Sequence, residues 1–400
     1  MNLAALRSGN FRTYFFGNAF ALNALWMQRV TIGWIAWDMT GAASFVGLVG
    51  MLQFAPIVVL GPFFGVWVDR INVKPAALAT QMGNLLVALA LLTTVWFEIL
   101  TPAVLLLLVI AAGIISAAHN PVRLSLAPRL VGRDLVASVV NLTSINFNLA
   151  RLIGPAIGGA AIAAFGVAQA LFIQVLCFLP FIFAITWLEV RPRAGEGQER
   201  PGFVEALREG LRHIRSEPLV RNAMLATGAM TLVARGVLEI LPILADGVFD
   251  KGASGLGMLT SAAGFGAVIG GFAKALVPPQ RPGRLPVSGL LAAWGAVALV
   301  PVLGVAPSWA LALASVAGIG FCTTVTAVSM QTAIQIDLPD ELRGRVMSLW
   351  IVVAVGGAAL GAGILGLLAD LIGFSLTLGL SGGVVAVVLG VFALRVWLRS

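Results

Sequence analysis

Four ionisable residues interrupt long apolar stretches of this chain: Arg29, Arg151, Arg235 and Glu239. Arg235 and Glu239 are one helical turn apart, so on a helix they share a face. Arginine in apolar surroundings binds anionic groups such as carboxylates, catecholates and phosphates, and a carboxylate in such a place can exchange a proton. Asn146 is an uncharged polar residue that we add to this set. These residue types predict recognition of an anion and movement of a proton.

The composition shows which kind of structure must position these residues. Charged residues make up 10% of the chain and apolar residues 59%, whereas soluble domains contain about a quarter charged residues. So little polar surface predicts a membrane protein, in which a net charge of +8 does not indicate nucleic acid as a partner. Cys177 and Cys322 both lie in apolar runs, so neither a disulfide framework nor a metal site is expected. The first apolar stretch, from near Tyr14, is too long for a cleavable signal.

Apolar runs long enough to cross a bilayer, roughly 20 residues each, predict an all-α protein with twelve transmembrane helices. The predicted spans are 13–38, 44–67, 75–97, 103–122, 137–163, 168–190, 219–244, 254–277, 286–303, 309–332, 346–369 and 375–396. With a cytoplasmic N-terminus, the cytoplasmic segments hold twenty of the 25 basic residues, and the opposite side keeps only Lys251. The excess of arginine and lysine on one side predicts that both termini are cytoplasmic.

The longest loop divides the chain into a bundle at 1–190, a linker at 191–218 and a bundle at 219–400. In the linker, "FVEALREGLRHI" places Phe203, Leu207, Leu211 and Ile214 on one helical face. That pattern predicts an amphipathic helix at the cytoplasmic membrane surface, and a solvated tether is an equally good interpretation.

The two bundles repeat each other. "LVGRDL" (130–135) resembles "DLPDEL" (337–342), and "GPAIGGAAIAAFG" (154–166) resembles "GAGILGLLADLIG" (361–373), both at an offset of 207. "ASFVG" (43–47) resembles "ASGLG" (253–257) at an offset of 210. These matches predict two pseudo-symmetric six-helix bundles, an architecture of transporters that bind substrate between the halves near the membrane midplane.

Two motifs point to a family. Gly65, Asp69, Arg70 and Lys74, between the second and third spans, resemble the signature loop of the major facilitator superfamily, although Asn72 and Val73 depart from it. Gly154-Pro155-x-x-Gly158-Gly159 in the fifth span resembles the motif of the superfamily's antiporters. The segments "LRSGNFRTYFFGNAFALNALWMQ", "WDMTGAASFVG" and "DLPDELRGRVMS" are similar to the enterobactin-exporter and macrolide-efflux branch. The resemblance covers essentially the whole chain.

The resemblance implies a role for the loop motif. It implies that Asp69 contacts the start of span eleven, near Gly344, and so closes the cytoplasmic side, since a carboxylate can accept from the free amides of a helix N-terminus. The alternative is that Arg70 and Lys74 only anchor the topology.

The motif in span five has a physical interpretation of its own. Pro155 should bend span five, and Gly154, Gly158 and Gly159 should let another helix approach closely. We expect that helix to be span eight, through Gly264, Gly266, Gly270 and Gly271.

For the buried charges we expect a role in a central cavity. At the offset of 210, Glu239 is the repeat-equivalent of Arg29, so the two would face each other from spans one and seven. The alternative for the pair is a static buried contact, and an equal alternative for Arg151 is that it holds backbone carbonyls. Asp38, Glu98 and Asp370 lie at outer helix ends, where ordinary solvation explains them.

These predictions converge on a secondary active transporter of the bacterial inner membrane, working by alternating access. We expect proton-coupled export of a small anionic molecule, siderophore-like or carboxylate-bearing, by a monomer. The alternatives are a multidrug or macrolide efflux pump, a channel, and a membrane scaffold or sensor. No cofactor or metal is expected, and the protein is not expected to be an enzyme. Dinucleotide-type and hydrolase-type letter patterns at 361–366 and 379–383 lie inside predicted spans.

Overall fold

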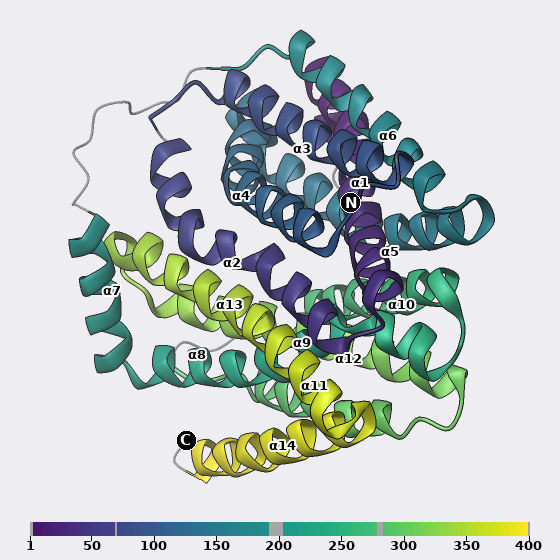
Figure 1. Cartoon of the computed structure of the whole chain (residues 1–400). Coiled ribbons are helices and arrows are strands. Elements are labelled where there is room, and N and C mark those ends of the chain that lie inside the picture. Colours follow the sequence, from purple (N-terminus) through teal and green to yellow (C-terminus); the bar gives the residue numbers. More distant parts are fainter. Residues whose placement is uncertain (1–2, 69, 192–202, 278–282, 399–400) are drawn as a thin grey trace. The chain divides into compact units, whose positions relative to one another are not determined.

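The computed structural model describes residues 3–68, 70–191, 203–277 and 283–398, and the regular structure within these ranges is entirely helical (Figure 1). The first half contains α1 (Gly9–Thr40), α2 (Ala43–Val68), α3 (Val73–Trp96), α4 (Pro102–Leu126), α5 (Val136–Phe165) and α6 (Val167–Trp187). The second half contains α7 (Phe203–Ser216), α8 (Pro218–Met230), α9 (Gly236–Glu239), α10 (Gly252–Ala275), α11 (Val287–Gly304), α12 (Trp309–Asp337), α13 (Asp340–Ile372) and α14 (Phe374–Leu398). Short 3-10 turns occur at Ala4–Arg7, Ala127–Leu130 and Arg133–Leu135. The predicted all-α class is confirmed.

Ten of the described helices are long and apolar enough to cross a membrane. The two further predicted spans are α1, which is long but carries Arg29 and several amides, and span seven, which is not one continuous helix. Span seven consists of α8, a π-helical turn η4 (Thr231–Arg235), α9 and a second π-helical turn η5 (Ile243–Val248). Gly236 and Pro242 lie within this stretch and weaken a regular helix. With these two, the count is consistent with twelve spans.

Single glycines make the tightest connections between neighbouring spans. Gly166 joins α5 to α6 with a φ of 91°, and Gly373 joins α13 to α14 with a φ of 87°. Only glycine adopts such angles without strain. The two positions are separated by the 207-residue offset predicted from the sequence, so the repeat extends to the backbone conformation of its turns.

The helices group into two compact units that interleave along the chain. The first unit comprises residues 1–39, 55–199 and 252–257, and the second comprises 40–54, 200–251 and 258–400. The division therefore differs from a simple cut at the linker, because the start of α2 packs with the second half and the start of α10 packs with the first.

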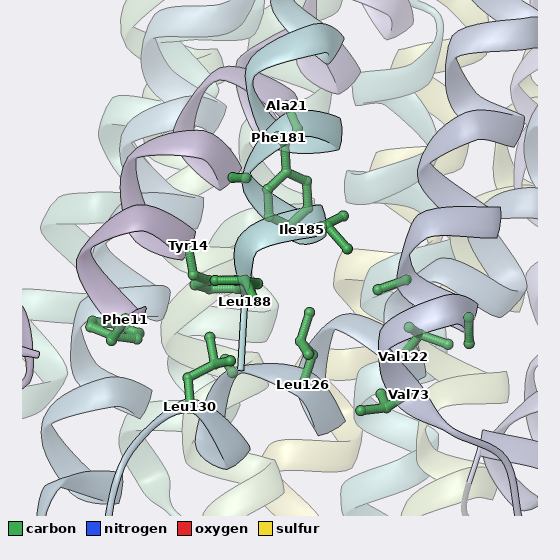
Figure 2. Packing of buried hydrophobic residues seen from close by; sticks show 14 of the residues in the cluster. Phe11, Tyr14, Ala21, Val73, Val122, Leu126, Leu130, Phe181, Ile185 and Leu188 are labelled. Atoms are coloured by element: carbon green, nitrogen blue, oxygen red, sulfur yellow. The ribbon is translucent and has the colours of Figure 1, made fainter. Parts of the chain in front are cut away.

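The core of the first unit is aromatic near the start of α1. Phe11 and Tyr14 stack with ring centroids 6.0 Å apart, and Tyr14 meets Phe181 of α6 edge to face at 5.5 Å. Figure 2 shows these rings with Ile185 and Leu188 in one apolar cluster. Since helix association inside a membrane depends on close packing, this cluster holds α1 against α6.

In the second unit, α11 packs against α12 and α14, and α13 packs along the broken span seven. Gly236 faces Gly361 so closely that a Cβ built on Gly236 would lie 2.8 Å from the Gly361 carbonyl carbon. Glycine at both positions therefore lets the two backbones touch.

The predicted repeat is visible in two glycine seams, one in each unit. In the second unit, a Cβ on Gly47 of α2 would lie 3.0 Å from Gly366 Cα of α13. In the first unit, a Cβ on Gly257 of α10 would lie 3.0 Å from Gly159 Cα of α5. Gly47 and Gly257 differ by 210 positions, and Gly159 and Gly366 by 207, which are the two offsets of the repeat. Repeat-equivalent glycines therefore make equivalent contacts in the two units.

Candidate functional site: an arginine–aromatic cluster

The first unit contains a cluster of cations around two aromatic rings. Arg29 lies one turn after Trp26 on α1, with its guanidinium carbon 4.9 Å from the centre of the Trp26 ring. Arg151 of α5 approaches the same ring at 5.9 Å. Phe147, one turn before Arg151, meets Trp26 at 5.9 Å and an interplanar angle of 67°. The predicted cavity residues Arg29 and Arg151 therefore lie on one tryptophan.

Arg123 is a third cation of this cluster. Its guanidinium carbon lies 5.5 Å from the centre of the Phe147 ring. The sequence placed Arg123 in a cytoplasmic loop because the apolar run ends at 122, but α4 continues through Leu126 and carries Arg123 on its last turn. The signal that was missed is the helical continuation "NPVRLSL", which contains no residue that stops a helix after Pro121.

The cluster joins three guanidinium groups, one each from α1, α4 and α5. Each arginine on an aromatic face contributes about 0.5–2 kcal/mol, depending on desolvation. Guanidinium forks bind carboxylates and phosphates in a planar, two-bonded geometry, and aromatic faces bind planar rings. The cluster is therefore suited to an anion attached to an aromatic group.

The glycine–proline motif positions this cluster by packing α5 against α1. A Cβ on Gly154 would lie 2.7 Å from Trp26 Cβ and 3.0 Å from the Asn23 carbonyl oxygen. A Cβ on Gly158 would lie 3.2 Å from Met27 Cα. Because these glycines let α5 touch α1, Arg151 reaches the Trp26 ring. Pro155 is buried within α5, whose helix continues through it.

The partner expected for this motif needs correction. Gly159 does face α10, but at Gly257 in its first turns. The expected partners further along span eight lie elsewhere, since Gly270 faces the Phe321 carbonyl of α12, and Gly271 has open space beside it. The helices cross at the start of α10, so its later glycines are turned toward α12.

Asn146 makes a packing contact that the sequence did not predict. Its side chain is 5% exposed, and Nδ2 donates to the Phe15 carbonyl oxygen at 3.1 Å. Phe15 belongs to α1, so Asn146 ties α5 to α1 inside the unit. This contact gives Asn146 a packing role, and the predicted cavity-lining role stays a prediction.

Arg235 and Glu239 lie in the broken span of the second unit. Arg235 ends the π-helical turn η4, Glu239 ends α9, and both are partly buried. A Cβ on Gly50 of α2 would lie 3.1 Å from Glu239 Cβ, so the acid lies directly against α2. π-Helical turns are frequent at functional sites. Arg29 belongs to the first unit and Glu239 to the second, and their meeting stays a prediction.

The loop motif is described except for its acid, because Asp69 lies outside the described residues. Gly65 has open space beside it and Arg70 is exposed. Lys74 does more than anchor topology, since its Nζ donates to the carbonyl oxygens of Thr186 at 2.9 Å and Leu188 at 2.7 Å. The lysine thus caps the end of α6, where a cation is favoured.

Asn72, which replaces a glycine of the family's loop, caps α3. Its side chain accepts from the Lys74 backbone amide at 3.1 Å. Asparagine is among the best residues for this position. The departure from the family motif therefore has a structural reason in this chain.

Comparisons with known proteins agree with this architecture. The family described as "Transmembrane secretion effector" matches residues 1–399. The enterobactin exporter EntS of Escherichia coli O1:K1 / APEC is 30% identical over 244 residues, which cover 61% of this chain and 57% of that protein. The chain thus aligns with little more than half the length of this curated relative.

Solved structures of the same fold extend over nearly the whole chain. A bacterial homologue of the human lysosomal transporter Spinster, in an inward-facing and unoccupied conformation, gives a TM-score of 0.74 at 16% identity over 98% of this chain and 97% of its own. The nucleoside transporter NupG gives 0.74 at 12% identity over 99% of both chains. These likenesses confirm the major facilitator fold and are consistent with twelve helices.

Proposed function

Because the chain belongs to the transmembrane secretion effector family of the major facilitator superfamily, we propose that it exports a small organic anion by alternating access. The observation that carries the proposal is the convergence of Arg29, Arg123 and Arg151 on the Trp26–Phe147 pair. Guanidinium groups bind anions, so three of them at one site favour an anionic substrate over a lipophilic cation. A planar aromatic carboxylate or catecholate fits both the guanidinium groups and the rings.

The direction and the energy source are part of the proposal. The name of the E. coli relative, an enterobactin exporter, supports export. We assign proton coupling to Glu239, the acid beside Arg235 in the broken span. Protonation of Glu239 would release an arginine, and an anionic substrate would compete for it. The excess of basic residues on one side supports cytoplasmic termini, and we propose that the unit of transport is a monomer.

Uptake into everted inner-membrane vesicles tests the proposal, because the vesicle lumen corresponds to the outer side. We expect radiolabelled 2,3-dihydroxybenzoate to accumulate when the lumen is acidic, and to accumulate much less without a pH gradient. Arg123→Gln and Arg151→Gln should each lower the initial rate about tenfold, the loss of one charge-assisted bond. Arg133→Gln, at an exposed position of the same unit, is the matched control and should transport normally.

Two results would contradict the proposal. The first is normal uptake by a variant that combines Arg29→Gln, Arg123→Gln and Arg151→Gln. The second is accumulation of labelled tetraphenylphosphonium or a labelled macrolide in place of the acid, which would favour a multidrug or macrolide efflux pump. A protein that moves none of these probes would be a candidate for a scaffold or sensor.

A further inference from the structure

Asp370, at the end of α13, makes a contact that solvation alone does not explain. Its Oδ1 accepts from the Ala43 backbone amide and its Oδ2 from the Ser44 amide, both at 2.8 Å. Ala43 and Ser44 are the first residues of α2, whose amides have no partner within that helix. A carboxylate from one helix therefore caps another, which corrects the expectation of ordinary solvation at this position.

The cap lies at the edge of the seam between α2 and α13. One turn away, a Cβ on Gly366 would lie 2.5 Å from the Ala43 carbonyl oxygen and 2.8 Å from Gly47 Cα. The two backbones touch here, and Val46 beside them is 1% exposed. Opening this seam requires both hydrogen bonds of Asp370 to break.

The equivalent seam in the first unit lacks the carboxylate. There, a Cβ on Gly159 would lie 2.6 Å from the Ala253 carbonyl oxygen and 2.8 Å from Gly257 Cα, nearly the same geometry. At the offset of 207, the residue equivalent to Asp370 is Ala163. Since that seam packs equally closely without an acid, Asp370 is not needed for the packing itself.

We propose that Asp370 is a latch that holds the outer ends of α2 and α13 together and is released when the transporter opens outward. The inference rests on the alternating access proposed above.

The rate at which a buried cysteine becomes accessible from outside tests the latch without any knowledge of the substrate. The background is the full chain with Cys177→Ser and Cys322→Ser. Val46→Cys reports on the seam of α2 and α13, and Leu256→Cys, its equivalent at 3% exposure, reports on the seam of α5 and α10. A membrane-impermeant maleimide is applied to spheroplasts. Where Val46→Cys does not fold, Val49→Cys, which is 3% exposed in the next turn, replaces it.

We expect Asp370→Asn to raise the labelling rate about tenfold at both reporters, because the asparagine keeps one acceptor and loses the charge. A carboxylate at the equivalent position of the seam of α5 and α10 should replace the lost latch. Adding Ala163→Asp to Asp370→Asn places a carboxylate where it can accept from the Ala253 and Ser254 amides, and both labelling rates should fall again.

Three results would overturn the latch. They are unchanged labelling in Asp370→Asn, faster labelling at Val46→Cys alone, and no effect of Ala163→Asp in the Asp370→Asn background. Faster labelling at Val46→Cys alone would mean local fraying of α2, which makes Asp370 an ordinary cap. Because none of these measurements involves transport, failure of the latch is distinguishable from failure of the proposed substrate.

Discussion

The seam of α5 and α10 allows a prediction about a single methyl group. In Gly159→Ala the new Cβ would lie 2.6 Å from the Ala253 carbonyl oxygen, 2.8 Å from Gly257 Cα and 3.0 Å from Gly257 N. All three neighbours are backbone atoms of α10, so no side chain can rotate away. The two helices must separate by about 0.8 Å at this point to reach an ordinary contact of 3.4 Å.

The magnitude follows from the cost of overpacking. Forcing a methyl group into a closely packed site costs roughly 1–3 kcal/mol. The gain in helix propensity from glycine to alanine is at most about 1 kcal/mol and offsets part of that cost. We therefore expect Gly159→Ala to lower the free energy of unfolding by about 1–2 kcal/mol, a fall of a few degrees in Tm.

Thermal unfolding in detergent, followed by circular dichroism, measures this effect. Gly271→Ala is the matched control, because it lies inside α10 with open space beside it and should be neutral or slightly stabilising. Gly366→Ala, the repeat-equivalent of Gly159, should behave like Gly159→Ala. If Gly159→Ala and Gly271→Ala had equal Tm values, this would refute the argument that backbone contact at this seam requires glycine at position 159.

Three further predictions concern single contacts. Lys74→Met should lower Tm, because two carbonyl oxygens at the end of α6 lose their donor at a cost of about 1–2 kcal/mol, whereas Lys74→Arg should retain most of the stability. Glu239→Gln should abolish the response of transport to a pH gradient while substrate exchange persists, and an undiminished response would place the proton elsewhere. Glu209 of α7 pairs with Arg345 of α13 at 38% and 22% side-chain exposure, so a double-mutant cycle of Glu209→Gln and Arg345→Gln should give a coupling below about 1 kcal/mol.

Much of the fold could be predicted because the membrane imposes it. Apolar runs of the required length mark the spans, and small residues mark close approaches, so Gly154, Gly158 and Gly159 were recognised as packing residues. The repeat was visible because matched segments of the two halves carry glycines at equivalent positions, and these glycines make equivalent backbone contacts in the structure. All of these features can be read from the sequence without knowing which residues are in contact.

The features that were missed depend on contacts between distant residues. The role of Lys74 depends on where α6 ends, and that of Asp370 on where α2 begins. Asn146 is polar enough to line a cavity, but its position against Phe15 gives it a structural bond. Span seven is apolar like a regular span, and its first π-helical turn, η4, lies where it packs on Gly357 and Gly361 of α13. The spacing of apolar residues along the chain contains no information about which distant residues come into contact.

The repeat separates residues needed for packing from residues needed for chemistry. The seam glycines occur in both halves, Gly159 with Gly366 and Gly47 with Gly257, because both seams require touching backbones. Two charged residues do not, since Arg151 corresponds to Ala358 and Asp370 to Ala163. The other half has the same packing arrangement without the charge, so the charge is dispensable for packing. For Arg151, within an apolar span, the charge is also costly. We therefore expect substitutions at these unmatched positions to change transport or gating more than stability, and substitutions at the matched glycines to do the reverse.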